Sequence, residues 1–580
     1  GPTPSALGDA AELLIQRIRQ VQPDFERSDE NARSIERIVM LTDGLPLAIE
    51  LAAARVRLLG VDALADRLSD QLRVLSSRSA ERPSRQRTLR ATLDWSWDLL
   101  DGYERACLAQ LSVFEGVFTV EAAEQVVQFD GDEAPWVDDV LMGLVEKSLV
   151  VCRVPAGERA PRLTLLRTVK QYGAEKLGPN SAATLGRHGS FYCRLGLHEP
   201  SDTLDVHGGE EQRQEWTLCL ADVLAATRRA IQAGDGLLAG AGARASWAIL
   251  CIKGPFSLGV QLLKDAIQVP SCTSQGVRLD LGRAMWRDGK LEEASHVLQQ
   301  VLVSARAEQD AALSASAGAV LGGLLWATGK NAESRIVLDE AAEIAEASGL
   351  RRRLGVIEGN RMVLCVMEGD PGAAVEVGQR AIQLHEAVGD TRALARATMN
   401  MGVLAIRMGE LASAEAYLRQ AVEAQSQMGN QHGLMFATGN LARLLLNRGE
   451  LDDARAQARK AARLAVEVGD RAYLSRFLNV RAELEAKAGD SKAARKALGR
   501  SQRLLRDDDG PITRAFVSLA AAWVALADRA WQQAADALDE ADRLTQDQPP
   551  DGVIRSDLEQ TREAVDRARL EPDSPGSTTD

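Results

Sequence analysis

The feature that most constrains this chain is a 40-residue repeat in its second half. A turn that starts with glycine, followed five residues later by a small residue, recurs at a constant interval of 40. The glycines are Gly289, Gly329, Gly369, Gly409, Gly449 and Gly489, and the small residues are Ala294, Ser334, Ala374, Ala414, Ala454, Ala494 and Ala534. A second set of turns contains Gly349, Gly389, Gly429 and Gly469. Each period therefore predicts two helices, separated by turns in which glycine adopts a positive φ.

Two further columns of the repeat predict how these helices pack. One column, in the second helix, is alanine, at Ala341, Ala381, Ala421, Ala461 and Ala541. The other, three residues before the first turn, is large and apolar, at Trp286, Trp326, Val366, Ile406, Leu446 and Leu526. We expect both columns to be buried, because alanine lets neighbouring helices approach closely. No helix pair can bury its own apolar face alone, so the pairs must stack into an α-solenoid.

The repeats, of which residues 440–465 are an example, resemble tetratricopeptide repeats. Their period is longer than the usual value of about 34, so HEAT-like repeats are the alternative, but the Gly-x-x-x-x-Ala turn favours the tetratricopeptide type. Seven periods cover 277–556, after a degenerate pair around 237–270 with Gly254 and Gly259 at its turns. We expect a capping helix from about Asp557 to Leu570, which makes 237–570 a superhelix, and a disordered tail at 571–580.

The first third of the chain has a different pattern. Helical periodicity covers 7–21 and 30–59, with Asp29 placed to cap the second stretch, and further helices are expected at 86–100 and 103–113. Short apolar runs at 149–154 and 162–165 predict a β-hairpin, and another helix follows at 168–177. Helices, a hairpin and a last helix in this order are typical of a winged helix. We therefore divide the region into a helical part at 1–80, a winged-helix domain at 81–178 and connecting helices at 179–236.

Five phrases in this region resemble bacterial STAND (NB-ARC-like) ATPases, in particular large LuxR-type and AfsR-like transcriptional regulators. In chain order they are DGLPLAIELAAARVRLL, RQRTLRATLDWSWDLL, LSVFEGVFTVEAAEQV, LVEKSLVV and LLRTVKQYGAEKL. The resemblance spans about residues 10–178, and that family carries repeats behind this region. It implies that residues 1–80 are the helical lid of an ATPase whose core lies upstream. Gly1-Pro2 is typical of a protease-cleavage remnant, which also predicts that the natural protein extends upstream.

The resemblance also implies a role for Gly44, Leu45 and Pro46, whose turn approaches the adenine of bound nucleotide in such ATPases. A helix-starting proline without a ligand is the alternative. The chain contains no GxxxxGK[ST], HExxH or GxSxG motif. We therefore expect no enzyme activity and no cofactor in this chain, with ATP or ADP bound only when the upstream ATPase domain is present.

Charge and cysteine content narrow the class of partner. The chain has 69 Lys and Arg against 82 Asp and Glu, a net charge of −13, which opposes non-specific attraction to nucleic acid or anionic membranes. The basic residues Arg82, Arg85, Arg87 and Arg90 precede the winged helix, but we do not expect them to bind DNA. The seven cysteines form no CxxC pair, and no apolar run is long enough to cross a bilayer, so a cytoplasmic protein is expected.

An asparagine column is the strongest candidate binding feature. Asn360, Asn400 and Asn440 occupy one repeat position although asparagine is a mediocre helix former. In the peptide-binding repeat proteins that this chain resembles, such an Asn points into the concave groove, where its amide pairs with a peptide backbone. Val403, Arg407, Arg443 and Asn447 would extend this stripe. The alternative is an asparagine ladder bonded to neighbouring turns.

The leading hypothesis is therefore a sensor and autoinhibitory module of a STAND-type regulator. It would bind a protein, peptide or small inducer in the groove. A passive protein-binding scaffold without switching is the alternative.

Overall fold

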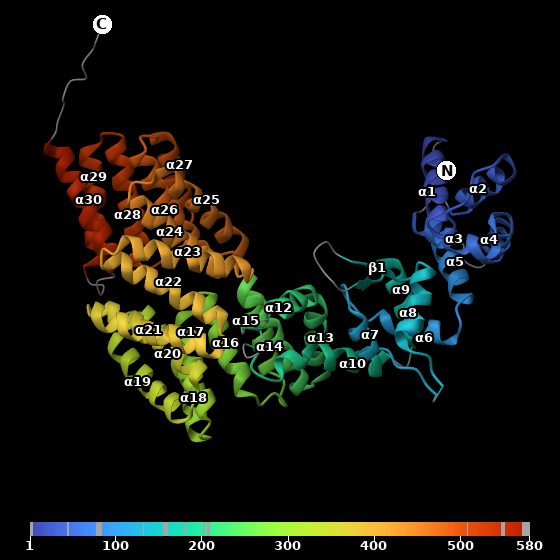
Figure 1. Cartoon of the computed structure of the whole chain (residues 1–580), viewed down its shortest axis with the longest axis horizontal. Coiled ribbons are helices and arrows are strands. Elements are labelled where there is room, and N and C mark those ends of the chain that lie inside the picture. The colour runs from blue at the N-terminus through green and yellow to red at the C-terminus, as the bar shows by residue number, and fades with distance from the viewer. Residues whose placement is uncertain are drawn as a thin grey trace, which may run out of the picture. The chain divides into compact units, whose positions relative to one another are not determined.

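The computed structural model describes the backbone of residues 4–42, 46–76, 84–131, 133–154, 161–178, 181–200, 204–205, 209–506, 509–546 and 552–570. The chain forms two compact units (Figure 1). The first contains residues 1–194 and 218–229, and the second contains residues 195–217 and 230–580. The tail at 571–580, predicted to be disordered, lies outside the described residues.

The first unit begins with five helices. They are α1 (Pro4–Val21), α2 (Asp29–Leu41), α3 (Pro46–Leu59), α4 (Val61–Ser76) and α5 (Ser84–Asp98). Leu14, Ile18, Ile38 and Leu64 are fully buried where α1–α4 meet. The predicted cap of α2 is wrong by one residue, because Ser28 forms a reciprocal capping box with Asn31. A serine hydroxyl one position earlier can accept the Asn31 amide, which leaves Asp29 as the first helical residue.

The predicted winged-helix order is confirmed in the same unit. Helices α6 (Gly102–Leu111), α7 (Val120–Val126) and α8 (Val137–Glu146) precede the hairpin, and α9 (Arg167–Leu177) follows it. Strands β1 (Val151–Arg153) and β2 (Arg162–Thr164) pair antiparallel, with Cys152 opposite Leu163. Leu163 is buried and also bridges to Phe118, so the hairpin is anchored to the helices by an apolar residue. Helix α10 (Ser181–Cys193) continues the chain and is followed by a short 3₁₀ turn, η2 (Arg194–Gly196). Helices α12 (Gly209–Leu218) and α13 (Leu220–Ala233) come next.

The second unit is a stack of antiparallel helix pairs, as predicted. The first pair is α14 (Gly236–Lys253) with α15 (Phe256–Ile267), and a final single helix, α30 (Gly552–Leu570), follows the last pair. The pairs between them are α16 (Gln275–Arg287) with α17 (Leu291–Ala307), α18 (Ala311–Ala327) with α19 (Asn331–Ala347), α20 (Arg351–Met367) with α21 (Pro371–Val388), α22 (Thr391–Arg407) with α23 (Leu411–Gln427), α24 (Gln431–Asn447) with α25 (Leu451–Val468), α26 (Arg471–Lys487) with α27 (Ser491–Gln502), and α28 (Pro511–Ala527) with α29 (Trp531–Thr545).

The turns have the backbone conformation that the glycine columns predict. Every glycine of the two turn columns has a positive φ, between 61° and 82°. Gln309 and Arg529 stand at two turn positions without glycine, and they have φ of 57° and 56°. At the first of these, Asp310 N donates to Ala305 O at 2.9 Å, which is the closing bond of a helix-ending αL turn. The fold therefore imposes the left-handed conformation even on a side chain that disfavours it.

The small-residue columns are buried as predicted, with Ala294, Ala374 and Ala381 fully inaccessible. Ser334 replaces alanine in one repeat and stays fully buried because its hydroxyl donates to Gly322 O at 2.8 Å. The prediction for the large apolar column is wrong in most repeats. Trp286, Trp326 and Val366 are only half-buried. They lie on the inner surface of the solenoid, where they line a cavity. The position one residue earlier is buried instead, as at Met285, Leu325 and Cys365.

The first helix pair departs from the predicted turns. Gly254 lies in the turn, with φ of 70°, but Gly259 lies inside α15. A Cβ on Gly259 would come within 2.7 Å of the Trp247 ring, so close helix packing explains this glycine. The capping helix α30 exists as predicted, although it starts at Gly552.

The first helices of successive pairs contact one another, as α18 does with α20 and α26 with α28, so they form the inner layer of the superhelix. The curvature is tight enough that α14 contacts α24. Phe256 of α15 and Arg287 of α16 also reach His432 of α24, and we call these three residues the closing seam. Arg287 Nη1 lies 2.9 Å from His432 Nε2, and the Phe256 and His432 rings pack edge to face at 5.7 Å. This part of the superhelix therefore closes on itself.

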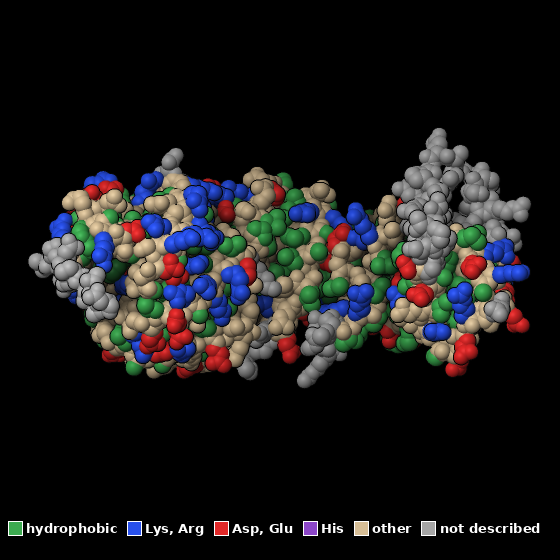
Figure 2. Space-filling view, turned by 90° about the horizontal axis from the view of Figure 1, so that it is seen from above, with side chains coloured by type: hydrophobic (Ala, Val, Ile, Leu, Met, Phe, Trp, Pro, Cys, Tyr) green, Lys and Arg blue, Asp and Glu red, His purple; other side chains and the backbone are tan. Residues whose placement is uncertain are grey.

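No helix within the described part of the chain is long and apolar enough to cross a membrane. On the face shown in Figure 2, basic and acidic side chains are interspersed over the surface.

Candidate functional site

The candidate site is a cavity of about 710 Å³ on the inner side of the closed part of the superhelix. Its walls come from the inner helices α14, α16, α18, α20, α22 and α24 and from the start of α26. A segment that precedes the repeats also lines it, and we call Glu199, Pro200, Leu204 and Asp205 the acidic strap. The volume is that of a site for a small organic molecule or a short peptide segment.

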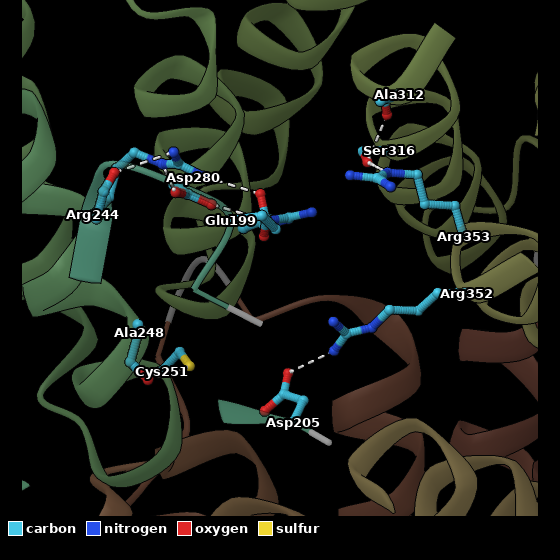
Figure 3. A network of polar contacts seen from close by, with 12 residues as sticks. Glu199, Asp205, Arg244, Ala248, Cys251, Asp280, Ala312, Ser316, Arg352 and Arg353 are labelled. Carbon is cyan, nitrogen blue, oxygen red and sulfur yellow. Dashed lines mark hydrogen bonds and ion pairs between the residues drawn. The ribbon is translucent and has the colours of Figure 1, made fainter. Parts of the chain in front are cut away.

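One end of the acidic strap is held by a buried ion-pair network (Figure 3). Arg244 donates to Asp280 at 2.8 Å and to Glu199 at 2.9 Å. Arg283 contacts the same two carboxylates, at 2.9 Å from Asp280 and 3.2 Å from Glu199. Two guanidinium groups therefore share two carboxylates, and the charges of this group balance within the wall.

The other end of the strap is held by Asp205. Its carboxylate lies 2.6 Å from Arg213 and 3.4 Å from Arg392. It also lies 3.8 Å from Arg352, as Figure 3 shows. Its carbonyl accepts from Thr391 N at 3.0 Å. Arg352 also donates to Asp390 at 2.7 Å. The strap thus ties the segment before the repeats to α20 and α22, across one side of the cavity.

A third group of cations has no such carboxylates. Arg287 donates to His432, and Arg396 has no ion-pair partner among the described residues. Burial, together with the nearby Arg392, lowers the pKa of Arg287 to about 10. Burial and Arg392 also lower the pKa of Arg396. Burial, with the positive charges of Arg287 and Arg392, holds the pKa of His432 well below its ordinary value, so this ring is neutral and accepts the Arg287 hydrogen bond.

The rest of the lining is largely apolar and aromatic. It includes Trp247, Trp286, Trp326, Val356, Val363, Met399, Phe436 and Tyr473. Large apolar walls with a few charged groups are the usual composition of a ligand pocket, in which apolar contacts supply affinity and polar groups fix orientation.

The structure brings three of the residues predicted for the groove to this cavity, namely Asn360, Asn400 and Arg407, and Val403 lies with them. Asn360 Nδ2 donates to Ala319 O of the preceding inner helix at 2.7 Å. This bond is the kind expected of an asparagine ladder, so both interpretations apply to Asn360. Asn400 makes no such bond within the described part of the chain, which leaves its amide available to a ligand.

The other predicted groove residues lie elsewhere. Arg443 is ion-paired with Glu483 at 2.6 Å and with Asp557 of α30 at 3.4 Å. Asn440 is half-buried, and Asn447 is exposed at the end of α24. The polar stripe therefore divides into a cavity-lining part and a part that meets the capping helix. Direct contact of any of these residues with a ligand stays a prediction.

The predicted nucleotide-facing turn is described only in part. Pro46 is the exposed first residue of α3, whereas Gly44 and Leu45 lie outside the described residues, as do the side chains of Arg82, Arg85 and Arg87. Arg90 is ion-paired with Glu175 of α9 and with Asp94 at 3.7 Å, so it is engaged within the first unit.

Sequence reasoning missed a buried polar centre in the first unit. Asp222 accepts hydrogen bonds from His188 Nε2 at 2.9 Å, from Glu115 N at 2.6 Å and from Gly116 N at 3.1 Å. Both side chains of the pair are fully inaccessible. Burial lowers the pKa of His188, although the bond to Asp222 opposes this shift. The centre joins α10 and α13 to the turn that follows α6.

Sequence reasoning also missed the arginines of the cavity, although a signal was present. In α22, Arg392, Arg396 and Asn400 are spaced by four residues and therefore share one helix face, which the asparagine column had already marked as concave. The contribution of the acidic strap had no such signal, because its contacts are with residues up to 187 positions away.

Comparisons with protein families agree with this architecture. A model described as a winged helix-turn-helix domain matches residues 100–178, and tetratricopeptide-repeat models match 395–428 and 437–468. The chain thus contains a winged helix and tetratricopeptide repeats, and the HEAT-like alternative is not supported.

Curated relatives match over about a third of the chain. A Mycobacterium tuberculosis protein named "Putative HTH-type transcriptional regulator Rv0890c" is 40% identical over 205 residues, which is 35% of this chain and 23% of the relative. "Uncharacterized protein Rv0894" of the same organism is 37% identical over 211 residues, or 36% of this chain and 52% of the relative. The chain thus spans between about a quarter and a half of the length of these relatives.

Solved structures with similar helical arrangements have low sequence identity. A STAND protein with a tetratricopeptide-repeat sensor, PH0952 from Pyrococcus horikoshii, is 14% identical and has a TM-score of 0.48, with 96% of this chain and 74% of that chain covered. A Rap protein in complex with competence and sporulation factor is 13% identical with a TM-score of 0.45, covering 66% of this chain and all of that chain.

Proposed function

We propose that this chain is the ligand-sensing part of a STAND-type transcriptional regulator, and that its ligand binds in the cavity of the superhelix. The observation that carries the proposal is the cavity itself, of about 710 Å³, whose wall contains three tryptophans and an Asn400 side chain with no bonded partner within the described part of the chain. A scaffold that binds proteins along a shallow groove needs no cavity of this volume lined by aromatic side chains. The ligand is a small organic molecule or a peptide segment short enough to enter the ring.

Several observations support the regulatory part of the proposal. The winged helix and the tetratricopeptide repeats occur in one chain, and curated relatives carry a transcriptional-regulator name. The first third contains the five phrases that resemble STAND ATPases. In this proposal, ligand binding favours one of two conformations of the superhelix, and the winged helix and lid transmit that choice to an upstream ATPase domain.

The binding step is testable with a neutral apolar dye, N-phenyl-1-naphthylamine, whose emission rises in apolar surroundings. We expect the dye to bind at about one site per chain, since its two aromatic groups fit the tryptophan-lined wall. Val403→Trp fills part of the cavity, while Val303→Trp makes the same change on the exposed outer layer, where Val303 is 66% accessible. Dye binding should be lost in the first variant and retained in the second. Equal binding by both variants would contradict the proposal.

The upstream part of the proposal has a separate test. The natural gene should encode a GxxxxGK[ST] loop before the codon for Gly1, because the resemblance places the ATPase core there. Its absence would remove the STAND assignment while leaving the ligand cavity intact.

A further inference from the structure

The described part of the cavity wall contains more positively charged than negatively charged side chains. Among the residues that the structure describes, seven arginines line the cavity, against five carboxylates. The arginines are Arg244, Arg283, Arg287, Arg352, Arg392, Arg396 and Arg407, and the carboxylates are Glu199, Asp205, Asp280, Asp390 and Asp470. The surplus is positive inside a chain whose net charge is −13, so it is a local property of the site and does not follow from overall composition.

Most of the acids are already committed to particular cations. Glu199 and Asp280 pair with Arg244 and Arg283, as described above. Asp205 lies between Arg352 and Arg392, whereas Asp390 pairs with Arg352 and caps α22 through Ala393 N at 2.9 Å.

The fifth acid, Asp470, attracts Arg287 electrostatically. Its carboxylate nevertheless accepts from Tyr473 N at 3.0 Å and makes no ion pair with Arg287 among the described contacts.

Three of the seven arginines make none of these ion pairs. Arg407 is engaged in another contact, and Arg287 and Arg396 have no bonded carboxylate within the described part of the chain. Arg287 bonds only to the neutral His432 ring, and Arg396 has no bonded partner within the described part of the chain. Both lie close enough to Arg392 for the three positive charges to repel one another, and burial and this repulsion lower the pKa of each of the two. The Arg396 side chain is nevertheless exposed to the space of the cavity. An anion placed between Arg287 and Arg396 would relieve the repulsion and regain the hydrogen bonds that both groups can donate.

The surroundings limit what else the anion carries. The same cavity presents Trp286, Met399, Phe436 and Tyr473, so a bare inorganic ion would leave most of the wall without contacts. We infer that the ligand is an amphipathic anion whose carboxylate, sulfonate or phosphate group binds Arg287 and Arg396 and whose apolar body fills the aromatic part of the cavity. This inference rests on the proposed function and adds the chemical class of the ligand.

Two dyes that differ in one group provide the test. 1-Anilinonaphthalene-8-sulfonate has the ring system of N-phenyl-1-naphthylamine with an added sulfonate. The full chain should bind the sulfonated dye at least about tenfold more tightly, at low ionic strength and pH 7. Arg396→Gln and Arg287→Gln should each remove most of this preference while leaving the affinity for the neutral dye nearly unchanged. Arg396→Lys should retain part of it, because the charge remains.

The matched control is Arg463→Gln, which removes a cation of the outer layer whose side chain is 69% accessible. It should change neither affinity. If the neutral dye binds but the sulfonate adds no affinity, or if Arg396→Gln keeps the preference, the inference of an anion subsite is overturned while the proposed cavity stands. If neither dye binds, both the inference and the proposed function fail.

Competition separates the two sources of such an anion. Displacement of the sulfonated dye by decanoate supports a small organic acid. Displacement by acetyl-Leu-Phe-Leu-Phe as the free acid, but not as its amide, supports a peptide carboxyl terminus. Displacement by decanol as effective as that by decanoate would contradict the inference, since the alcohol has no charge.

Discussion

The αL position of Gln309 offers the sharpest test of the repeat geometry. A positive φ costs a non-glycine residue about 1–2 kcal/mol relative to glycine. Glycine also increases the conformational entropy of the unfolded chain, which offsets about 0.4–1 kcal/mol of this gain in folding stability. Gln309 has φ of 57° and an exposed side chain, so no packing is lost when the side chain is removed. We therefore expect Gln309→Gly to raise the free energy of unfolding by about 0.5–1 kcal/mol.

The same reasoning predicts the reverse change one period later. Gly349 holds the equivalent position with φ of 66°, and an added Cβ would meet no atom within 4 Å. Gly349→Gln should therefore lower the free energy of unfolding by a similar amount through backbone strain alone. Gln268→Gly is the matched control, because Gln268 ends α15 with φ of −72°. At that position the glycine should destabilise the fold by about 0.5–1 kcal/mol.

Thermal unfolding followed by circular dichroism would measure all three variants. For the transition of the superhelix we expect a rise in Tm of about 1–3 °C for Gln309→Gly and falls of similar size for the other two. If Gln309→Gly lowers Tm as much as Gln268→Gly does, the residue is not held at a positive φ, and the assignment of this turn to the glycine column is refuted.

Two further predictions concern buried polar groups. Asp222→Ala leaves His188 and two backbone amides without their shared acceptor, so we expect the first unit to lose about 3 kcal/mol or more of stability in urea unfolding, with a smaller loss for Asp222→Asn. A loss below about 0.5 kcal/mol for Asp222→Ala would show that the centre is not formed. Burial lowers the pKa of His385 to about 4, despite the opposing charge of Asp390. Because the folded state then resists a proton that the unfolded histidine accepts below about 6.5, stability should fall as pH drops from about 6.5 to 4, by up to about 1.4 kcal/mol per pH unit, and His385→Gln should make this decline shallower. A decline of unchanged slope in the variant would exclude His385 as its source.

The solenoid could be predicted because its determinants are local and periodic. Glycine at a fixed interval determines where each helix ends, and alanine at the interface determines how closely the helices pack. The roles of Gly409 and Ala421 can therefore be predicted from the sequence of a single repeat. The wing was predictable for the same reason, since Cys152 and Leu163 belong to two short apolar runs separated by a polar connection.

The cavity could not be predicted in the same way, because it depends on curvature summed over several repeats. Nothing local pairs Arg287 with His432, which is 145 residues later in the chain. The same holds for Arg443, whose helix position suggested the groove but whose charge is taken up by Asp557 of the capping helix. Asn400 and Asn440 share a column, but of these two only Asn400 lines the cavity. The helices that surround a given column position differ from one part of the superhelix to the next.

The closing seam also changes how cooperatively the second unit should unfold. In an open array each repeat stabilises only its two neighbours, so helices can fray inward from either end. Here the first helix pair of the array also contacts α24. Unfolding any helix between α14 and α24 therefore removes packing contacts from the helices on both sides of it. The stretch from α14 to α24 should thus melt as one block, with α26 to α30 behaving as an appended segment that can loosen independently.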